Sequence, residues 1–116
     1  MASNRISPFN SQNTFMSRHV LRDYFLFPFV GRMDDIWPSY YIQALGHKVI
    51  YGEPTVVQKR NDHNLMVDFN KEVVGYQNNL ELIKGLYQDP ESIKQHLPGR
   101  VVYAWDLYRK HLKEIT

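Results

Sequence analysis

The last third of the chain has the clearest pattern of hydrophobic and polar positions. Between residues 69 and 87, apolar side chains recur at alternating steps of four and three, which places them on one face of a helix. They are Phe69, Val73, Tyr76, Leu80, Ile83 and Tyr87. The same spacing returns near the C-terminus, in Val101, Trp105, Tyr108, Leu112 and Ile115. We therefore expect two amphipathic helices that pack together, with both apolar stripes in the hydrophobic core.

Turn residues set the limits of two shorter helices. Asp89 can accept a hydrogen bond from a free helix amide, and Pro90 needs no donor at the first helical position. The segment "DPESIKQHL" is therefore expected to form a short helix that stops at Pro98-Gly99. Upstream, a helix is expected from about Asp35 to Leu45, and Gly46 can adopt the left-handed conformation that ends it.

Three short segments have the character of β-strands. Residues 47–51 and 55–59 are rich in β-branched and aromatic side chains and are bounded by turn residues. Residues 14–18 fit either a strand or the start of a short helix, and the first thirteen residues fit a loop. The predicted fold class is α+β: a small β element, a short helix that begins at an acidic pair, and a C-terminal helical tail. Residues 1–63 and 64–116 are expected to form one structural unit.

Composition limits the function classes. A chain of 116 residues is one domain at most or part of a larger one. A mean hydropathy of -0.48, with no long apolar run, predicts no transmembrane segment. The N-terminus lacks the apolar stretch of a signal peptide and the chain has no cysteine, so we expect a cytoplasmic protein. Fourteen basic residues are scattered among twelve acidic ones, which disfavours nucleic-acid binding.

The segment "GRMDDIWPSYYIQALGHKVIY" places two carboxylates, Asp34 and Asp35, at the start of the expected helix. One Asp is explained as a helix cap, and Pro38 fits the first turn. A second carboxylate is not needed for capping. It either adds to the favourable interaction with the helix dipole or is free to take a proton from a substrate.

The chain resembles a known family in three places. The segments "SPFNSQNTFMSR", "FPFVGRMDDIW" and "EPTVVQKRNDH" are together similar to bacterial glycosyltransferase-like proteins, distantly similar to STELLO and to plant reversibly glycosylated polypeptides. The acidic pair before a helix, followed by Gly46 and "KVIY", resembles the C-terminal, acceptor-side half of GT-A-type nucleotide-sugar glycosyltransferases. The resemblance runs from about Ser7 to His63.

This resemblance implies an inverting sugar transfer from a nucleotide sugar to a glycan or lipid-linked acceptor. It makes Asp35 the base that removes the acceptor proton. Asp34 then caps the helix or holds the acceptor. Trp37 is either an apolar wall for a sugar ring or a buried anchor of its helix.

Other residues are candidates for the same site. The amides of Asn10, Gln12 and Asn13 suit either hydroxyl recognition or turn formation. Arg60 and His63 are weak candidates for a diphosphate or metal contact, and a lone His in a polar stretch is more often exposed. Arg18 and Arg32 are further candidates for phosphate contacts, because a guanidinium binds an oxyanion through two donors.

The chain also departs from the family. It has no Asp-x-Asp motif and no preceding run of βα units. A divalent metal (Mn or Mg) is therefore expected only together with a donor-binding half, and none on this chain alone. An acceptor-side half would leave apolar surface uncovered, so we expect a homo-oligomer or a partner chain. The alternative function is a non-catalytic interaction module that docks through its aromatics and helical tail. The expected location is the cytoplasm, including the inner face of the membrane.

Overall fold

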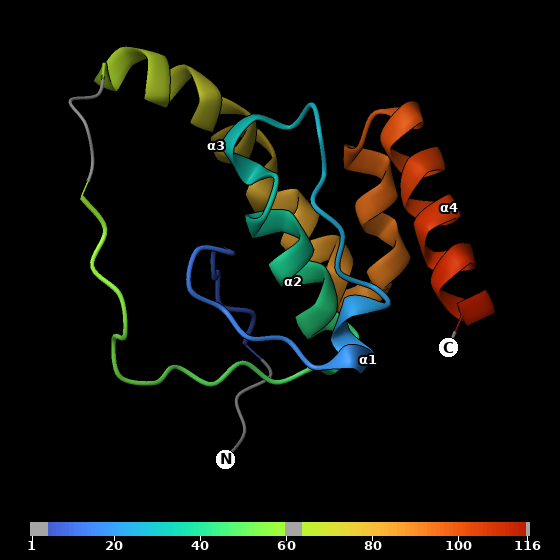
Figure 1. Cartoon of the computed structure of the whole chain (residues 1–116). Helices are drawn as coiled ribbons and strands as arrows, with labels where there is room; N and C mark the ends of the chain where they lie inside the picture. Colours follow the sequence, from blue (N-terminus) through green and yellow to red (C-terminus); the bar gives the residue numbers. More distant parts are fainter. Residues whose placement is uncertain (1–4, 60–63, 116) are drawn as a thin grey trace.

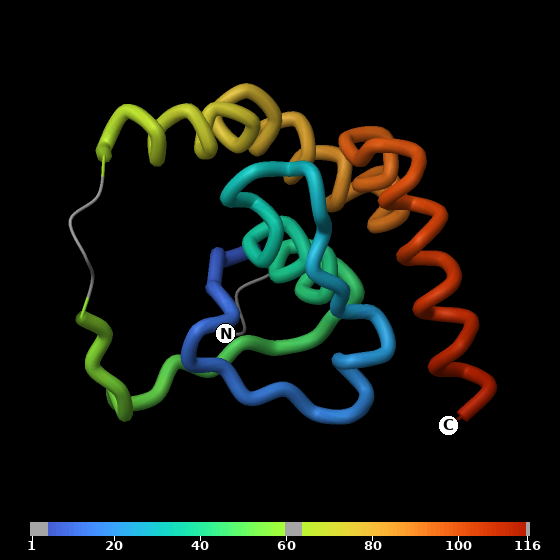
Figure 2. Tube along the Cα trace, turned by 45° about the horizontal axis from the view of Figure 1, so that its top comes forward, coloured from blue at the N-terminus to red at the C-terminus, as the bar shows by residue number. Residues whose placement is uncertain are grey.

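The computed structural model describes residues 5–59 and 64–115, and over these ranges the chain forms helices joined by turns and extended loops (Figure 1). In chain order the elements are α1 (Arg18–Leu21), η1 (Gly31–Met33), α2 (Ile36–Ala44), α3 (Leu65–Gln88), η2 (Pro90–His96) and α4 (Gly99–Ile115). Figure 2 shows α2 in the angle between the two long outer helices, α3 and α4. No helix in these ranges is long and apolar enough to cross a bilayer.

The predicted α+β fold class is wrong, because residues 5–59 and 64–115 contain no strand. Residues 14–17 are loop before α1 begins, and residues 47–59 are irregular backbone without a ladder partner. Ile50 and Val57 in this segment are almost fully exposed. Their side chains favour an extended backbone, but a strand also needs a second segment to pair with. The local preference was therefore not enough to form a sheet.

Capping side chains explain where the helices start. The Asn64 side chain accepts hydrogen bonds from the amides of Met66 and Val67, at 3.0 and 3.3 Å, and begins α3. Asp89 accepts from the Glu91 amide at 3.1 Å, which confirms the predicted start at Asp89-Pro90, although the segment winds as a 3-10 helix. Gly46, at φ 102°, ends α2 as expected.

The hydrophobic core lies where α2 meets α4, η2 and the C-terminal half of α3. Its centre is Trp105, which is fully buried and packs edge-on against Phe27 and Tyr41, with ring centroids 5.0 and 4.6 Å apart. Val101 is buried beside it, so the first part of the predicted α4 stripe is confirmed as core. The end of that stripe is not, because Ile115 is exposed.

The predicted burial of the α3 stripe is wrong for four of its six residues, whereas Ile83 does pack against the core. The helix forms as expected, but Phe69, Tyr76, Leu80 and Tyr87 are 50%, 73%, 67% and 58% exposed. The face that packs on the rest of the chain is instead marked by Gly75, Leu82 and Leu86. Gly75 belongs there because a Cβ would lie 2.6 Å from the Met33 sulfur, so only glycine lets η1 approach this closely without a shift. Both faces of α3 therefore carry apolar residues, and the face that bears Gly75 is the buried one.

A polar cluster joins α4 to η2 and α2. The Arg109 guanidinium lies 3.1 Å from a Glu91 carboxylate oxygen and 3.5 Å from an Asp23 carboxylate oxygen. The Tyr41 hydroxyl donates to Glu91 at 2.9 Å. Burial opposes the charge on Glu91, but hydrogen bonds from Arg109 and Tyr41 outweigh it and lower the Glu91 pKa. The cluster therefore holds α4 against η2 and α2.

Candidate functional site

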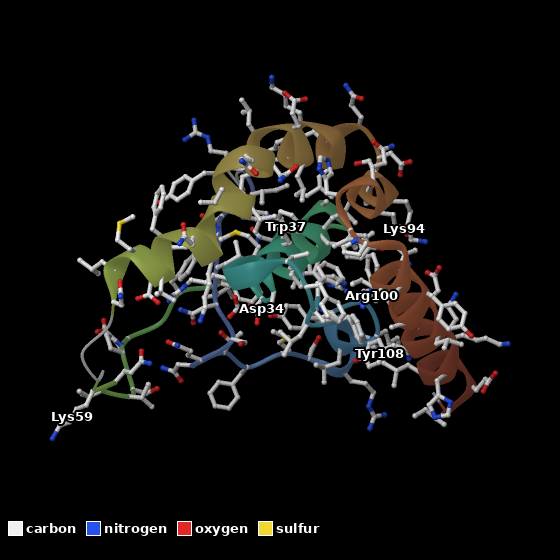
Figure 3. The ribbon with its side chains drawn as sticks, turned by 90° about the horizontal axis from the view of Figure 1, so that it is seen from above. Asp34, Trp37, Lys59, Lys94, Arg100 and Tyr108 are labelled. Carbon is white, nitrogen blue, oxygen red and sulfur yellow. The ribbon has the colours of Figure 1, made fainter. Side chains whose placement is uncertain are left out.

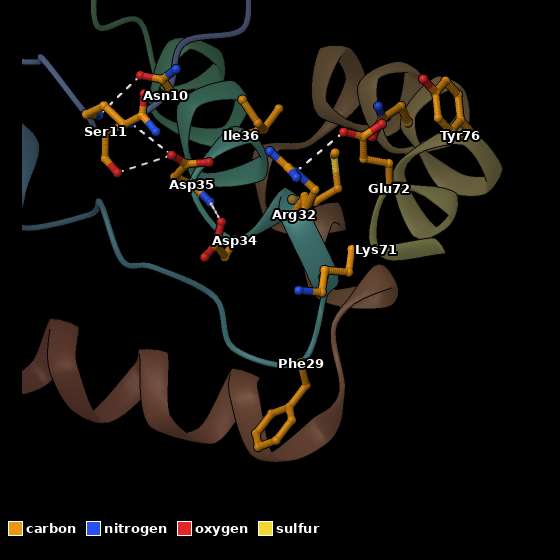
Figure 4. A pocket seen from close by; sticks show the side chains of 14 residues that line it. Asn10, Ser11, Phe29, Arg32, Asp34, Asp35, Ile36, Lys71, Glu72 and Tyr76 are labelled. Carbon is orange, nitrogen blue, oxygen red and sulfur yellow. Dashed lines mark hydrogen bonds and ion pairs between the residues drawn. The ribbon is translucent and has the colours of Figure 1, made fainter. Parts of the chain in front are cut away.

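A hollow of about 900 Å³ lies between the N-terminal loop, η1, the start of α2 and the middle of α3 (Figure 4). Asn10 and Gln12 line it from the loop, and the acidic pair lines it from the start of α2. Lys71 lines it from α3. The structure thus brings five of the site's polar residues together from segments up to 61 positions apart in the chain. We call this hollow the acidic-pair pocket.

Asp35 ties the N-terminal loop to the start of α2. One oxygen of its carboxylate accepts hydrogen bonds from the Ser11 amide at 2.9 Å and from the Ser11 hydroxyl at 3.1 Å (Figure 4). Asp35 stands at the N-cap position of α2, but its side chain makes no capping hydrogen bond to the helix. Its carboxylate is therefore used to hold the loop that forms one wall of the pocket.

Asp34 is the less constrained carboxylate of the pair. One of its oxygens accepts a hydrogen bond from the Asp35 amide at 2.9 Å, and the side chain is otherwise exposed along the pocket. Partial burial raises the Asp34 pKa above its usual value, and the neighbouring Asp35 charge raises it further. Because both Ser11 donors are taken up by Asp35, Asp34 is the carboxylate of the pair that is more open to a ligand.

Trp37 lies between α2 and α3 rather than at the pocket surface (Figure 3). Its side chain is fully buried, and its indole N–H donates to the Asn79 side-chain oxygen at 2.7 Å. Of the two roles expected for Trp37, the structure shows the buried anchor. Its partner Asn79 does line the pocket, so Trp37 supports one wall from behind.

The three loop residues with side-chain amides do not all lie at the pocket. The Asn10 side-chain oxygen accepts from the Gln12 amide at 3.1 Å, which is turn chemistry, yet both residues also line the pocket. Asn13 points elsewhere: its side-chain amide donates to the Thr55 hydroxyl at 3.0 Å and joins the loop to the extended segment. Asn10 and Gln12 therefore stay candidates for ligand contact, and Asn13 has a structural role.

The basic candidates are distributed differently from the expectation. Arg32 lines the pocket, but its guanidinium is paired with Asp68 at 3.1 Å and Glu72 at 3.4 Å on α3. Arg18 lies in α1, outside the pocket lining. Arg60 and His63 lie outside the described residues. Among residues 5–59 and 64–115, no three His, Asp or Glu side chains gather as a metal site requires.

Phe29, Lys71 and Tyr76 are among the pocket residues that were not predicted. Phe29 and Tyr76 are exposed aromatics that line it, and Lys71 is a cation that makes no ion pair with the residues that the structure describes. The Phe29 backbone has φ 64°, a left-handed conformation that a non-glycine residue rarely adopts. The Arg100 guanidinium stacks 3.6 Å from the Phe29 ring centre and holds it there. Nothing in the sequence around Phe29 indicated a pocket.

The tether between Asp35 and Ser11 predicts a local effect. In Asp35→Ala the Ser11 amide and hydroxyl lose their charged acceptor, which is worth about 1–3 kcal/mol. We expect amide hydrogen exchange at Ser11 to accelerate by at least about tenfold, while exchange in α4 stays unchanged. Residue-resolved exchange measurements on both proteins test this. Unchanged protection at Ser11 would show that the loop is held by other contacts.

Comparisons with known proteins give no relative. No family model, no curated protein and no solved structure matches the chain. The resemblance to GT-A-type glycosyltransferases is therefore not supported. It also fails on the fold, because the strands that it implies at residues 47–51 and 55–59 are absent from the described structure.

Proposed function

We propose that the chain binds a neutral, hydroxyl-rich ligand, such as a glycan, in the acidic-pair pocket, and that the ionised Asp34 carboxylate accepts a hydrogen bond from one of the ligand's hydroxyl groups. The observation that carries the proposal is the division of roles within the pair. Asp35 is held by two hydrogen bonds from Ser11, and Asp34 lines the pocket with a raised pKa. An ionised carboxylate that is open to the pocket is a strong hydrogen-bond acceptor for such a hydroxyl.

The chemistry of the lining supports a hydroxyl-rich ligand. A hydroxyl both donates and accepts hydrogen bonds, and the amides of Asn10 and Gln12 do the same. Asp34 supplies an acceptor and Lys71 supplies donors. The lining has three carboxylates (Asp34, Asp35, Glu72) and two cations (Arg32, Lys71), so its net charge is −1. A polyanion is disfavoured by this balance, whereas a neutral sugar is not.

The aromatic residues support a sugar ring in particular. Phe29 and Tyr76 lie in the lining with exposed rings. The C–H face of a sugar packs against aromatic rings, while its hydroxyls form hydrogen bonds with nearby polar side chains. Pockets that combine apolar surface with a few placed polar groups are typical ligand sites.

The raised pKa of Asp34 predicts a pH dependence. An ionised Asp34 is needed to accept the hydroxyl hydrogen bond, and its pKa lies above the usual Asp value. Affinity should therefore fall as the pH is lowered, beginning at a higher pH than for an ordinary Asp. Asp34→Asn should bind roughly tenfold more weakly at neutral pH, with a flat profile between pH 4 and 7. An Asp34→Asn variant that keeps the wild-type pH profile would remove Asp34 from the proposal.

Saturation-transfer NMR with a panel of neutral oligosaccharides, sialylated oligosaccharides and linear polyols tests the ligand class. We expect signals from neutral oligosaccharides, loss of these signals in Asp34→Ala, and no loss in Glu114→Ala, which removes an exposed carboxylate from the far end of α4. A panel without any neutral sugar signal, or equal signals from both variants, would contradict the proposed function.

A second candidate function is an interaction module, which the exposed stripe on α3 favours. Such a role does not depend on the acidic-pair pocket. The spacing and exposure of the stripe define what kind of partner it fits.

A further inference from the structure

The exposed stripe of α3 has the spacing of a coiled-coil seam. Starting at Met66, its apolar positions alternate in steps of three and four over three heptads. They are Met66, Phe69, Val73, Tyr76, Leu80, Ile83 and Tyr87. The mean step of 3.5 residues is the period at which one helix keeps the same face against another. We call these seven residues the α3 seam.

Most of the α3 seam is separate from the face by which α3 holds the fold, although Ile83 is half-buried and packs against the hydrophobic core. Gly75, Leu82 and Leu86 are buried against the rest of the chain, whereas Met66, Tyr76 and Leu80 are largely exposed. The Phe69 and Tyr76 rings touch each other, with centroids 5.9 Å apart. At its C-terminal end the seam meets the N-terminal loop, where the Ile6 amide donates to the Tyr87 hydroxyl at 3.3 Å. The most open part is therefore the stretch from Met66 to Leu80, and beyond it the Tyr87 side chain is still 58% exposed.

Helix length and area fit a helical partner. The 24 residues of α3 span about 36 Å. A buried aromatic side chain covers about 150–250 Å². Phe69, Tyr76 and Tyr87 are each at least half exposed. Together with Met66 and Leu80 they can bury on the order of 500 Å² of surface per copy. Two copies then bury about 1,000 Å², the lower limit for a specific interface.

We propose that the α3 seam is a dimer interface in which α3 packs antiparallel against α3 of a second copy. The same seven residues serve both copies, as a two-fold interface requires. In the antiparallel register that places Tyr76 opposite Leu80 of the second copy, Phe69 lies opposite Tyr87 and Val73 opposite Ile83, so these layers are apolar. Met66 lies beyond the end of the second copy's α3.

The flanking positions are compatible with this register. Among them only Glu72 and Lys84 are charged. The register places Lys84 opposite Asn70 of the second copy, and Glu72 is paired with Arg32 of its own chain, so no like charges meet. At the two-fold axis, Gln77 lies opposite Gln77 of the second copy. The seam shares Tyr76 with the acidic-pair pocket, so dimerisation would cover one edge of that pocket.

The absence of cysteine from the chain makes the register directly testable. Gln77→Cys, at an exposed position, introduces one thiol, which should form an intermolecular disulfide under mild oxidation. Lys110→Cys, exposed on α4, is the matched control and should stay largely reduced. Light scattering of the unmodified protein should show a concentration-dependent dimer.

A charge in the seam gives the complementary test. Leu80→Glu should weaken dimerisation by at least about tenfold, because the charge would be buried in the interface, while the monomer keeps the circular dichroism of the wild type. Glu81→Gln, next to it but outside the seam, should leave the dimer unchanged. A wild-type protein that stays monomeric at all concentrations would overturn the dimer, and a seam that binds only another protein's helix would do the same. Sugar binding is measured separately, so failure here leaves the proposed function standing.

Discussion

Trp105→Ala should lower the free energy of unfolding by about 3–5 kcal/mol, the largest effect expected from a core substitution in this chain. The indole is fully buried and lies against Phe27 and Tyr41, and the Arg109 guanidinium covers it at 4.8 Å from the ring centre. Its N–H also donates to the Asp23 carbonyl at 3.1 Å, so truncation leaves a cavity and an unpaired acceptor.

Denaturant unfolding followed by circular dichroism measures the Trp105 effect. Trp105→Phe should recover part of the loss, because it restores apolar volume but not the hydrogen bond to Asp23. Tyr103→Ala on the same helix is the control, because Tyr103 is largely exposed and should cost under about 1 kcal/mol. Equal losses at Trp105 and Tyr103 would mean that α4 does not pack on α2 as described.

Gly31→Ala should destabilise the chain by about 3 kcal/mol or more and also disrupt the acidic-pair pocket. Gly31 has φ 61°, which costs a side-chain-bearing residue about 1–2 kcal/mol. An added Cβ would also clash with the Lys71 carbonyl oxygen and lie 3.2 Å from its carbonyl carbon. This neighbour is the backbone of α3, which cannot rotate away as a side chain can, so η1 and α3 must separate.

Gly52→Ala is the matched control for Gly31→Ala. Gly52 lies in the extended segment, and a Cβ there would meet nothing within 4 Å. Thermal melts should show a clear drop for Gly31→Ala and almost none for Gly52→Ala. Similar melting temperatures for the two variants would show that η1 is not wedged against α3.

Local signals in the sequence predicted the helices well. The stop at Gly46 and the start at Asp89 depend on a single residue's backbone and side-chain chemistry, and both are confirmed. Burial is a property of the whole fold and was harder to predict. Leu82 and Leu86 are buried, whereas Tyr76 and Leu80 with the stronger periodic pattern are exposed, because contact with η1 selects the face that bears Gly75.

The strands and the site were also not fully predictable from local sequence signals. Residues 47–59 have strand propensity, but no propensity specifies the pairing partner that a sheet requires. At the site, the acidic pair was recognised as a candidate from its position alone. The division of roles was not predictable, because it depends on Ser11, which lies 24 residues before Asp35 and meets it only in the folded chain. Phe29 enters the pocket through a backbone conformation that its residue type does not favour.

Amide chemical-shift mapping with a neutral oligosaccharide tests the central claim most directly. We expect the shifts to cluster on the pocket lining, at Ser11 and Gln12 of the loop, Asp34 before α2, and Lys71 on α3. They should disappear in Asp34→Ala at the same sugar concentration, while the rest of the spectrum shows an intact fold. Shifts that map to another face of the molecule, or that persist unchanged in Asp34→Ala, would contradict the assignment of the acidic-pair pocket as the ligand site.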